Sequence, residues 1–72
     1  MTSASTVSIV VNGEAQAWPQ GTTIADLVAS MALAGKRFAV ECNQEIVPRT
    51  EHAGTPLRTG DQVEIVQAIG GG

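Results

Sequence analysis

Aromatic and basic residues are scarce in this sequence. Its 72 residues contain one Phe, one Trp and no Tyr, and four Lys and Arg stand against seven Asp and Glu, for a formal net charge of −3. Proteins that bind nucleic acids neutralise phosphates with a basic patch and stack bases on aromatic side chains. Neither kind of residue is clustered here, so we expect no nucleic-acid partner and favour a basic protein surface.

Cysteine and long apolar runs are scarce as well. The single Cys42 cannot form an internal disulfide, and no apolar run approaches the roughly 20 residues of a membrane-spanning helix. The opening MTSASTVSIV lacks the basic and apolar regions of a secretory signal. We therefore expect a cytoplasmic protein without a membrane partner. Apolar residues make up 43% of the chain and charged residues 15%, which suits one small folded domain.

Reactive side chains are too few to build a catalytic or metal site. His52 is the sole histidine, and beside Glu51 we expect it at the surface. Cys42 shares strand parity with Phe38 and Val40, which predicts a buried apolar thiol and not a nucleophile. Phosphate-binding and Ser-His-Asp motifs are missing. The sequence thus predicts a protein that is not an enzyme and binds no metal.

Apolar and polar residues alternate at both ends of the chain. Residues 7–18 predict a hairpin, because the pair Asn12-Gly13 tolerates the positive φ of a type I′ turn. Further strands are predicted at residues 38–42, 46–47 and 63–67. We expect the first and last strands to pair in parallel at the centre of one sheet.

A helix is predicted between the hairpin and the third strand. Thr23-x-x-Asp26 resembles a capping box that opens it, and Gly35 can close it in the left-handed conformation after about three turns. Its core-facing residues are Ile24, Leu27, Val28 and Met31. Residues 50–55 are predicted to be irregular.

The order β-β-α-β-β-β predicts an α+β fold, a mixed sheet of four to five strands packed on one main helix. We expect residues 1–5 to be a flexible leader, residues 6–68 the folded domain and residues 69–72 a flexible glycine-rich tail. The side of the sheet without the helix is the predicted docking surface, with Val10, Val66 and Ala68 as its candidates.

The sequence ends in VQAIGGG, three glycines directly after the last predicted strand. From Gln67 this segment can extend roughly 20 Å, and glycine has no Cβ to collide with a narrow channel. A terminal carboxylate is ionised and unreactive at neutral pH. An ATP-dependent partner could join it to AMP, and a sulfur nucleophile could then displace AMP to leave a thiocarboxylate on Gly72.

Four stretches carry a resemblance to a known family: VNGEAQAW, GTTIADLV, AVECNQEIVPR and GDQVEIVQAIGGG. Together they resemble the ThiS-like sulfur carrier proteins of thiamine thiazole biosynthesis, within the ubiquitin-like β-grasp superfamily. The pattern NxxIVPR at residues 43–49 is more discriminating than the paired glycines, which many ubiquitin-like proteins share.

The resemblance implies a function for the tail. In that family an E1-like adenylyltransferase uses ATP to adenylate the last glycine, and a cysteine desulfurase or other sulfur donor supplies the sulfur of the thiocarboxylate. Thiazole synthase then receives that sulfur. Gly72 would be the reacting residue. Gly71 and Gly70 would form the tail required for entry into the partner's active site, with Gly70 as an extra glycine beyond the minimal Gly-Gly ending. No cofactor would be bound permanently.

Three alternatives remain open at this point. The small subunit of molybdopterin synthase is also a Gly-Gly sulfur carrier on this fold, although NxxIVPR favours the thiamine branch. A ubiquitin-like modifier would instead join Gly72 to a lysine of a target protein. A plain interaction domain would leave the tail unused.

Replacing Gly71 with Val tests the predicted threading of the tail. We expect Gly71→Val to block adenylation, because a β-branched side chain adds bulk where a narrow channel admits glycine. Pyrophosphate release with the adenylyltransferase and ATP measures this step, and a normal rate for the variant would contradict the steric argument.

Overall fold

The chain forms a hairpin, a helix, a second hairpin, a short 3-10 helix and a final strand. The computed structural model describes residues 5–33 and 36–67. The elements are β1 (Thr6–Val11), β2 (Glu14–Pro19), α1 (Ile24–Ser30), β3 (Phe38–Cys42), β4 (Glu45–Val47), the 3-10 helix η1 (Arg49–Gly54) and β5 (Gln62–Gln67). The predicted order of strands and helix is confirmed.

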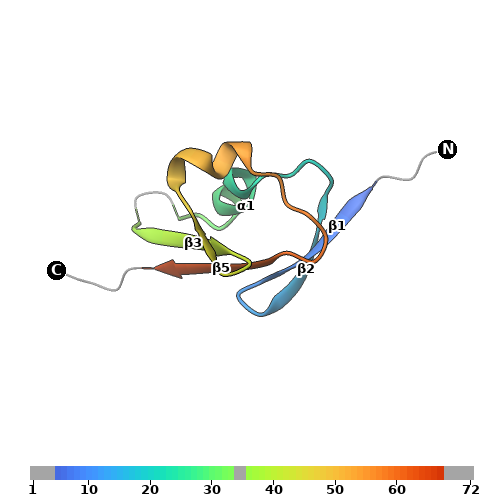
Figure 1. Ribbon diagram of the computed structural model, residues 1–72, viewed down its shortest axis with the longest axis horizontal. Helices are drawn as coiled ribbons and strands as arrows, with labels where there is room; N and C mark the ends of the chain where they lie inside the picture. Colours follow the sequence, from blue (N-terminus) through green and yellow to red (C-terminus); the bar gives the residue numbers. More distant parts are fainter. Residues whose placement is uncertain (1–4, 34–35, 68–72) are drawn as a thin grey trace.

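β5 lies in the middle of the five-stranded sheet, whose order is β2-β1-β5-β3-β4 (Figure 1). It runs parallel to β1 and antiparallel to β3, which confirms the predicted parallel pair. The amides of Val10 and Asn12 donate to the carbonyls of Asp61 and Val63 over 3.0 and 2.9 Å. The last strand is therefore held on both sides.

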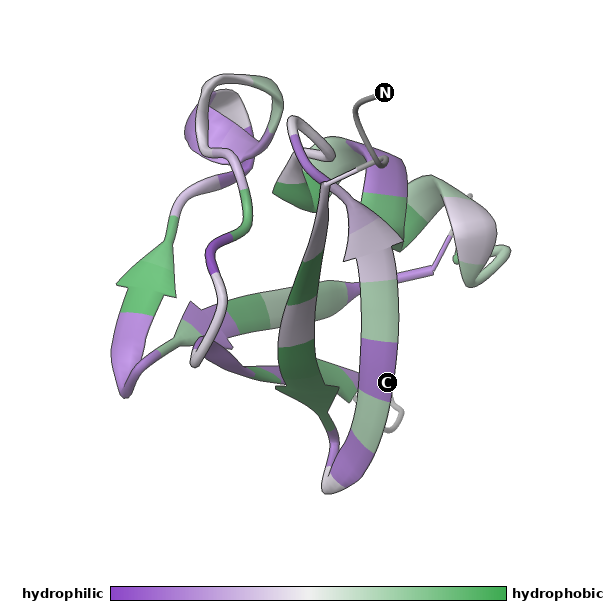
Figure 2. Ribbon diagram, turned by 90° about the vertical axis from the view of Figure 1, so that its right-hand side faces the viewer, coloured by the Kyte–Doolittle hydropathy of each residue, from purple (hydrophilic) through white to green (hydrophobic). Residues whose placement is uncertain are grey.

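One face of the sheet is buried under α1 and η1. Successive side chains of a strand point to opposite faces, and the buried residues of β1 and β5 alternate accordingly. Figure 2 shows the matching alternation of hydrophobic and hydrophilic residues along the strands. Ile24 and Leu27 of α1 are 0% and 1% exposed above them. The core consists of Val7, Ile9, Val11, Ile24, Leu27, Leu33, Val40, Leu57, Val63 and Ile65.

The helix begins as predicted and ends earlier. The Asp26 amide donates to Thr23 Oγ1 over 3.2 Å and the Thr23 amide donates to Asp26 Oδ2 over 3.0 Å, a complete capping box. However, α1 spans seven residues and its C-cap is Met31, so the prediction of three turns closed by Gly35 is wrong. Ala32 has a positive φ of 56°, which takes the chain out of the helix and lets Leu33 enter the core.

The segment predicted to be irregular is also more regular than expected. Pro48 is the N-cap of η1, and the chain after this 3-10 helix attaches to the start of α1. The amide of Ile24 donates to the Thr55 carbonyl over 2.9 Å, and that of Leu57 donates to Thr22 over 2.8 Å. η1 and α1 thus lie side by side over the core (Figure 1).

The predicted leader and tail stay predictions, because all of their residues except Ser5 lie outside the described part of the chain. β1 starts at Thr6, and the Ser5 carbonyl accepts a hydrogen bond of 3.0 Å from the Gln20 amide. β5 ends at Gln67, one residue before the predicted end of the domain.

Asn12 joins the first hairpin to the last strand. It turns the chain with a φ of 51°, followed by Gly13 at 86°, as expected of the predicted hairpin turn. Its Oδ1 accepts a hydrogen bond of 2.9 Å from the Ile65 amide, 53 residues further along. The side chain thereby continues the β1–β5 ladder after β1 itself has turned away.

We expect Asn12→Ala to destabilise the domain by about 2 kcal/mol, since alanine disfavours positive φ by about 1–2 kcal/mol and the Ile65 amide loses its acceptor. For a domain of this size, each kcal/mol lowers Tm by about 4–8 °C. Asn12→Gly separates the two causes. Glycine adopts the positive φ without strain, but it provides no acceptor for the Ile65 amide. Asn12→Asp keeps an acceptor oxygen, and thermal melts in which all three variants match the wild type would exclude this role.

Candidate functional site

The predicted reaction site lies beyond the end of β5. Gln67 pairs with Phe38, the first residue of β3, at one tip of the sheet (Figure 1). Gly70, Gly71 and Gly72 lie outside the described residues, as does Ala68 of the predicted docking surface. The structure therefore gives the point from which the tail departs, and the roles of these glycines stay predictions.

Asn43 explains the first position of the NxxIVPR pattern. It has a φ of 54° in the turn between β3 and β4, a conformation that asparagine tolerates better than most residues. Its Nδ2 donates to Asp61 Oδ1 and its Oδ1 accepts from the Gln62 amide, both over 3.0 Å. The second hairpin is thereby fastened to the start of β5.

The last positions of the pattern enclose His52. Its Nε2 lies 3.0 Å from the carbonyl oxygen of Val47, and a carbonyl oxygen accepts only, so Nε2 carries the hydrogen. The imidazole stacks on Phe38 with ring centroids 6.3 Å apart, and the Arg49 guanidinium carbon lies 5.1 Å from the Phe38 ring centroid. Pro48 follows β4 directly and is the N-cap of η1.

The prediction that His52 lies at the surface is wrong, because its residue is only 7% exposed. η1 turns the imidazole inward, where the Val47 carbonyl satisfies the nitrogen and Phe38 covers the ring. The nearby Phe38 also pairs with Gln67, so this stack supports the strand end from which the tail leaves.

The side of the sheet without the helix carries exposed apolar residues, named here the outer face. Val66 is 55% exposed and Val10 is half-buried, so both lie where the sequence places them. Ile46 is 62% exposed and was not among the predicted docking residues. The strand register places Ile46 on the outer face. It lies opposite Glu41, which in turn lies opposite Glu64 on the same face.

Cys42 is half-buried and packs against the core, so it is less buried than the sequence predicts. Burial raises the pKa of its thiol, and the nearby carboxylates of Asp61 and Glu45 raise that pKa further. A thiol with a raised pKa is protonated at neutral pH and a poor nucleophile. The surroundings of Cys42 therefore do not favour a reactive thiolate.

A mixed sheet with its last strand at the centre, packed on one helix, defines a β-grasp domain. The fold matches the crystal structure of the thiamine biosynthesis protein ThiS from Geobacter metallireducens with a TM-score of 0.71 and 27% identity, over 92% of this chain and 100% of that one. The chain belongs to the ThiS family, whose sequence model matches residues 4–72, and it is a ThiS-like sulfur carrier.

Two relatives describe the family further. The sulfur carrier protein ThiS of Bacillus subtilis is 40% identical over 63 residues, which cover 86% of this chain and 96% of the relative. The thiazole synthase of Paramagnetospirillum magneticum is 36% identical over 66 residues, 92% of this chain, and this chain spans only 20% of its length. Within residues 5–33 and 36–67, no helix is long and apolar enough to cross a membrane.

The pH dependence of alkylation tests the state of Cys42. Because the thiolate is the reactive form, a raised pKa makes iodoacetamide react more slowly than with an unfolded cysteine at neutral pH. We expect the midpoint of the rate against pH to lie above the ordinary thiol pKa of about 8.5. Glu45→Gln removes one negative charge and should move the profile to lower pH, whereas a wild-type midpoint below the ordinary value would contradict the assignment.

Proposed function

We propose that this chain carries sulfur as a thiocarboxylate on Gly72 and donates it for thiazole phosphate formation in thiamine biosynthesis. The single observation that carries the proposal is the family match, which continues to residue 72 and so includes the whole glycine ending. The named sulfur carriers among its relatives support the same function.

The chemistry begins with activation of an unreactive group. The ionised carboxylate of Gly72 attacks the α-phosphorus of ATP, pyrophosphate leaves, and an acyl adenylate forms. A sulfur nucleophile then attacks the carbonyl carbon and AMP leaves with the bonding electrons. Where that nucleophile is a persulfide, a thiol reductant must then cleave the sulfur–sulfur bond of the resulting acyl disulfide. The product is a thiocarboxylate. Every reacting group except the terminal carboxylate belongs to ATP or comes from a partner protein, so the chain acts as a carrier and not as a catalyst.

The folded body contributes a fixed origin for the tail. β5 is hydrogen-bonded between β1 and β3, and Asn12 and Asn43 add side-chain bonds to it. Threading the glycines into an active site costs about 1–2 kcal/mol of backbone entropy per residue. Partner contacts on the folded domain must offset that cost. Val66 and Ile46 of the outer face are the large exposed apolar residues that can make such contacts.

The partners follow from the reaction sequence. An E1-like adenylyltransferase with ATP forms the adenylate, a cysteine desulfurase or other donor supplies sulfur, and thiazole synthase receives it. The relative named thiazole synthase supports the last partner, since a segment similar to this whole domain lies within that longer chain. We place these steps in the cytoplasm.

Mass spectrometry of the intact chain tests the proposal. After incubation with the adenylyltransferase, ATP, a cysteine desulfurase, cysteine and a thiol reductant, we expect one oxygen of the terminal carboxyl group to be replaced by sulfur. Covalent conjugates to other proteins would instead indicate a modifier, and an unchanged mass would contradict sulfur carriage.

Deleting Gly71 and Gly72 separates the tail's chemistry from the stability of the body. We expect Tm to change by less than about 2 °C, because the core lies within residues 7–65 and glycine buries no side chain. The same deletion should abolish thiocarboxylate formation and thiazole synthesis. Thiazole synthesis that persists in the truncated protein would refute the role of Gly72.

A further inference from the structure

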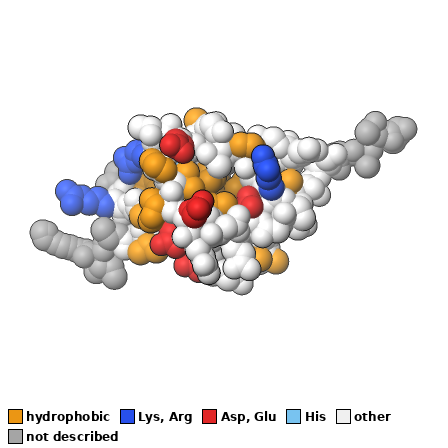
Figure 3. Space-filling view, in the orientation of Figure 1, with side chains coloured by type: hydrophobic (Ala, Val, Ile, Leu, Met, Phe, Trp, Pro, Cys, Tyr) orange, Lys and Arg blue, Asp and Glu red, His pale blue; other side chains and the backbone are white. Residues whose placement is uncertain are grey.

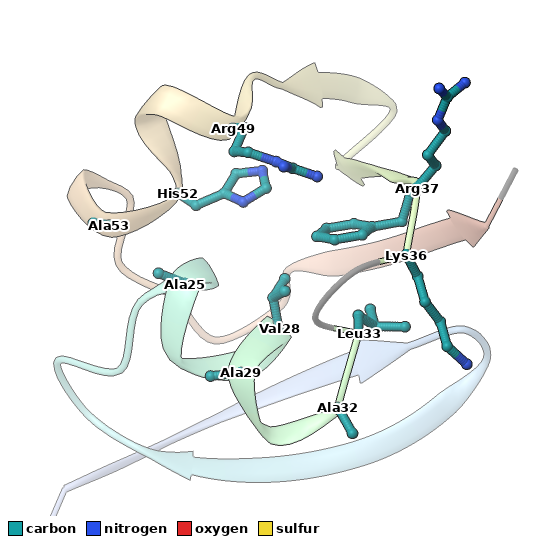
Figure 4. A pocket seen from close by; sticks show the side chains of 11 residues that line it. Ala25, Val28, Ala29, Ala32, Leu33, Lys36, Arg37, Arg49, His52 and Ala53 are labelled. Carbon is teal, nitrogen blue, oxygen red and sulfur yellow. The ribbon is translucent and has the colours of Figure 1, made fainter.

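A groove of about 730 Å³ lies between α1, η1 and the start of β3, on the opposite side of the sheet from the outer face. Val28, Leu33 and Phe38 give it an apolar floor, and Ala25 and Ala29 of α1 and Ala53 of η1 form part of its walls. Figure 4 shows Val28 and Leu33 on the helix side, facing His52 and Arg49 from η1. Its volume lies within the range of ligand sites in proteins.

The groove is basic although the protein is acidic. Three of the four Lys and Arg residues in the sequence line it, Lys36, Arg37 and Arg49, and none of its described lining residues is acidic. In Figure 3 basic side chains accordingly appear at the end of the molecule where β5 finishes, with a further basic group towards the other end. The remaining basic residue, Arg58, does not line the groove.

The groove ends beside the point where the tail departs. Phe38 forms part of its floor and is also the strand partner of Gln67, the last residue of β5. A protein segment seated in the groove therefore brings the rest of that protein to the tail. This matters only if the tail reacts in a partner's active site, so the inference rests on the proposed function.

We propose that the groove binds an acidic amphipathic segment of a partner protein that acts on the chain end. An apolar side chain of that segment covers Val28, Leu33 and Phe38. Its carboxylates pair with Arg49 and, at the edge of the groove, with Lys36 and Arg37, whose side chains extend outward in Figure 4. Charge complementarity selects this occupant, because a basic rim around an apolar floor repels basic segments and leaves a purely apolar one without partners for the cations.

The two sides of the domain then suit partner surfaces of opposite charge. The outer face presents Glu41 and Glu64 beside Ile46 and Val66, so it suits the basic protein surface that the net charge favours. The groove suits an acidic segment. A carrier that meets an adenylating enzyme and then a synthase can in this way be held through different sides, while its tail enters either active site.

Binding measurements with both the adenylyltransferase and thiazole synthase test the groove. The variants are Arg37→Glu, which reverses a charge at the rim, and Ala29→Trp, which fills the groove from an exposed position of α1. We expect each to weaken binding to at least one of the two enzymes by about tenfold at low salt. The effect of Arg37→Glu should shrink at high salt, because exposed charges are screened.

Matched controls give the test its specificity. Arg58→Glu makes the same charge change outside the groove, and Ala29→Ser leaves the groove open, so both should bind within about twofold of the wild type. Unchanged binding of Arg37→Glu to both enzymes, with its fold intact by circular dichroism, overturns the proposal. A groove effect seen only in self-association of the free chain also overturns it, since the occupant would then be a second copy.

Binding is measured without ATP, which keeps this proposal separable from the one on which it rests. A chain that binds through the groove and never acquires sulfur would refute the carrier chemistry alone. A chain that acquires sulfur normally, with every groove variant binding like the wild type, would refute the groove alone.

Discussion

The position of β5 between β1 and β3 is the constraint on which the rest of the structure depends. A parallel neighbour on one side and an antiparallel neighbour on the other satisfy the backbone of the strand that precedes the tail. Two asparagines, one from each hairpin turn, add hydrogen bonds to this strand at Ile65 and Gln62. Both hairpins are thus organised around the last strand, whose final residue, Gln67, is paired with Phe38 of β3.

The NxxIVPR pattern acquires a physical meaning from the same arrangement. Asn43 fastens the second hairpin to β5, Ile46 is exposed on the outer face, and Arg49 lies over Phe38 at the rim of the groove. The pattern therefore combines a structural bond with residues on both sides of the sheet. A short stretch of sequence can serve stability and partner binding together because β4 and η1 adjoin directly at Pro48.

Features set by neighbouring residues could be predicted from the sequence, and features set by distant contacts could not. Strand alternation, the Asn12-Gly13 turn and the Thr23 capping box depend on local conformation, and all three are confirmed. The early end of α1 depends on Leu33 entering the core, which the local pattern does not reveal. The burial of His52 likewise requires the Val47 carbonyl and the Phe38 ring. The groove forms where α1, η1 and the start of β3 come together, so no single stretch of sequence predicts it.

The central place of β5 also has a consequence for how the protein is made. While the chain is being synthesised, β1 and β3 have no partner between them until the last strand has left the ribosome, and contacts that span more than 50 residues form slowly. A prematurely terminated chain lacks the strand that joins the two hairpins and cannot complete its core. The domain can thus fold only after β5 has been synthesised. An enzyme that recognises the folded domain therefore binds only chains that extend at least to the end of this strand.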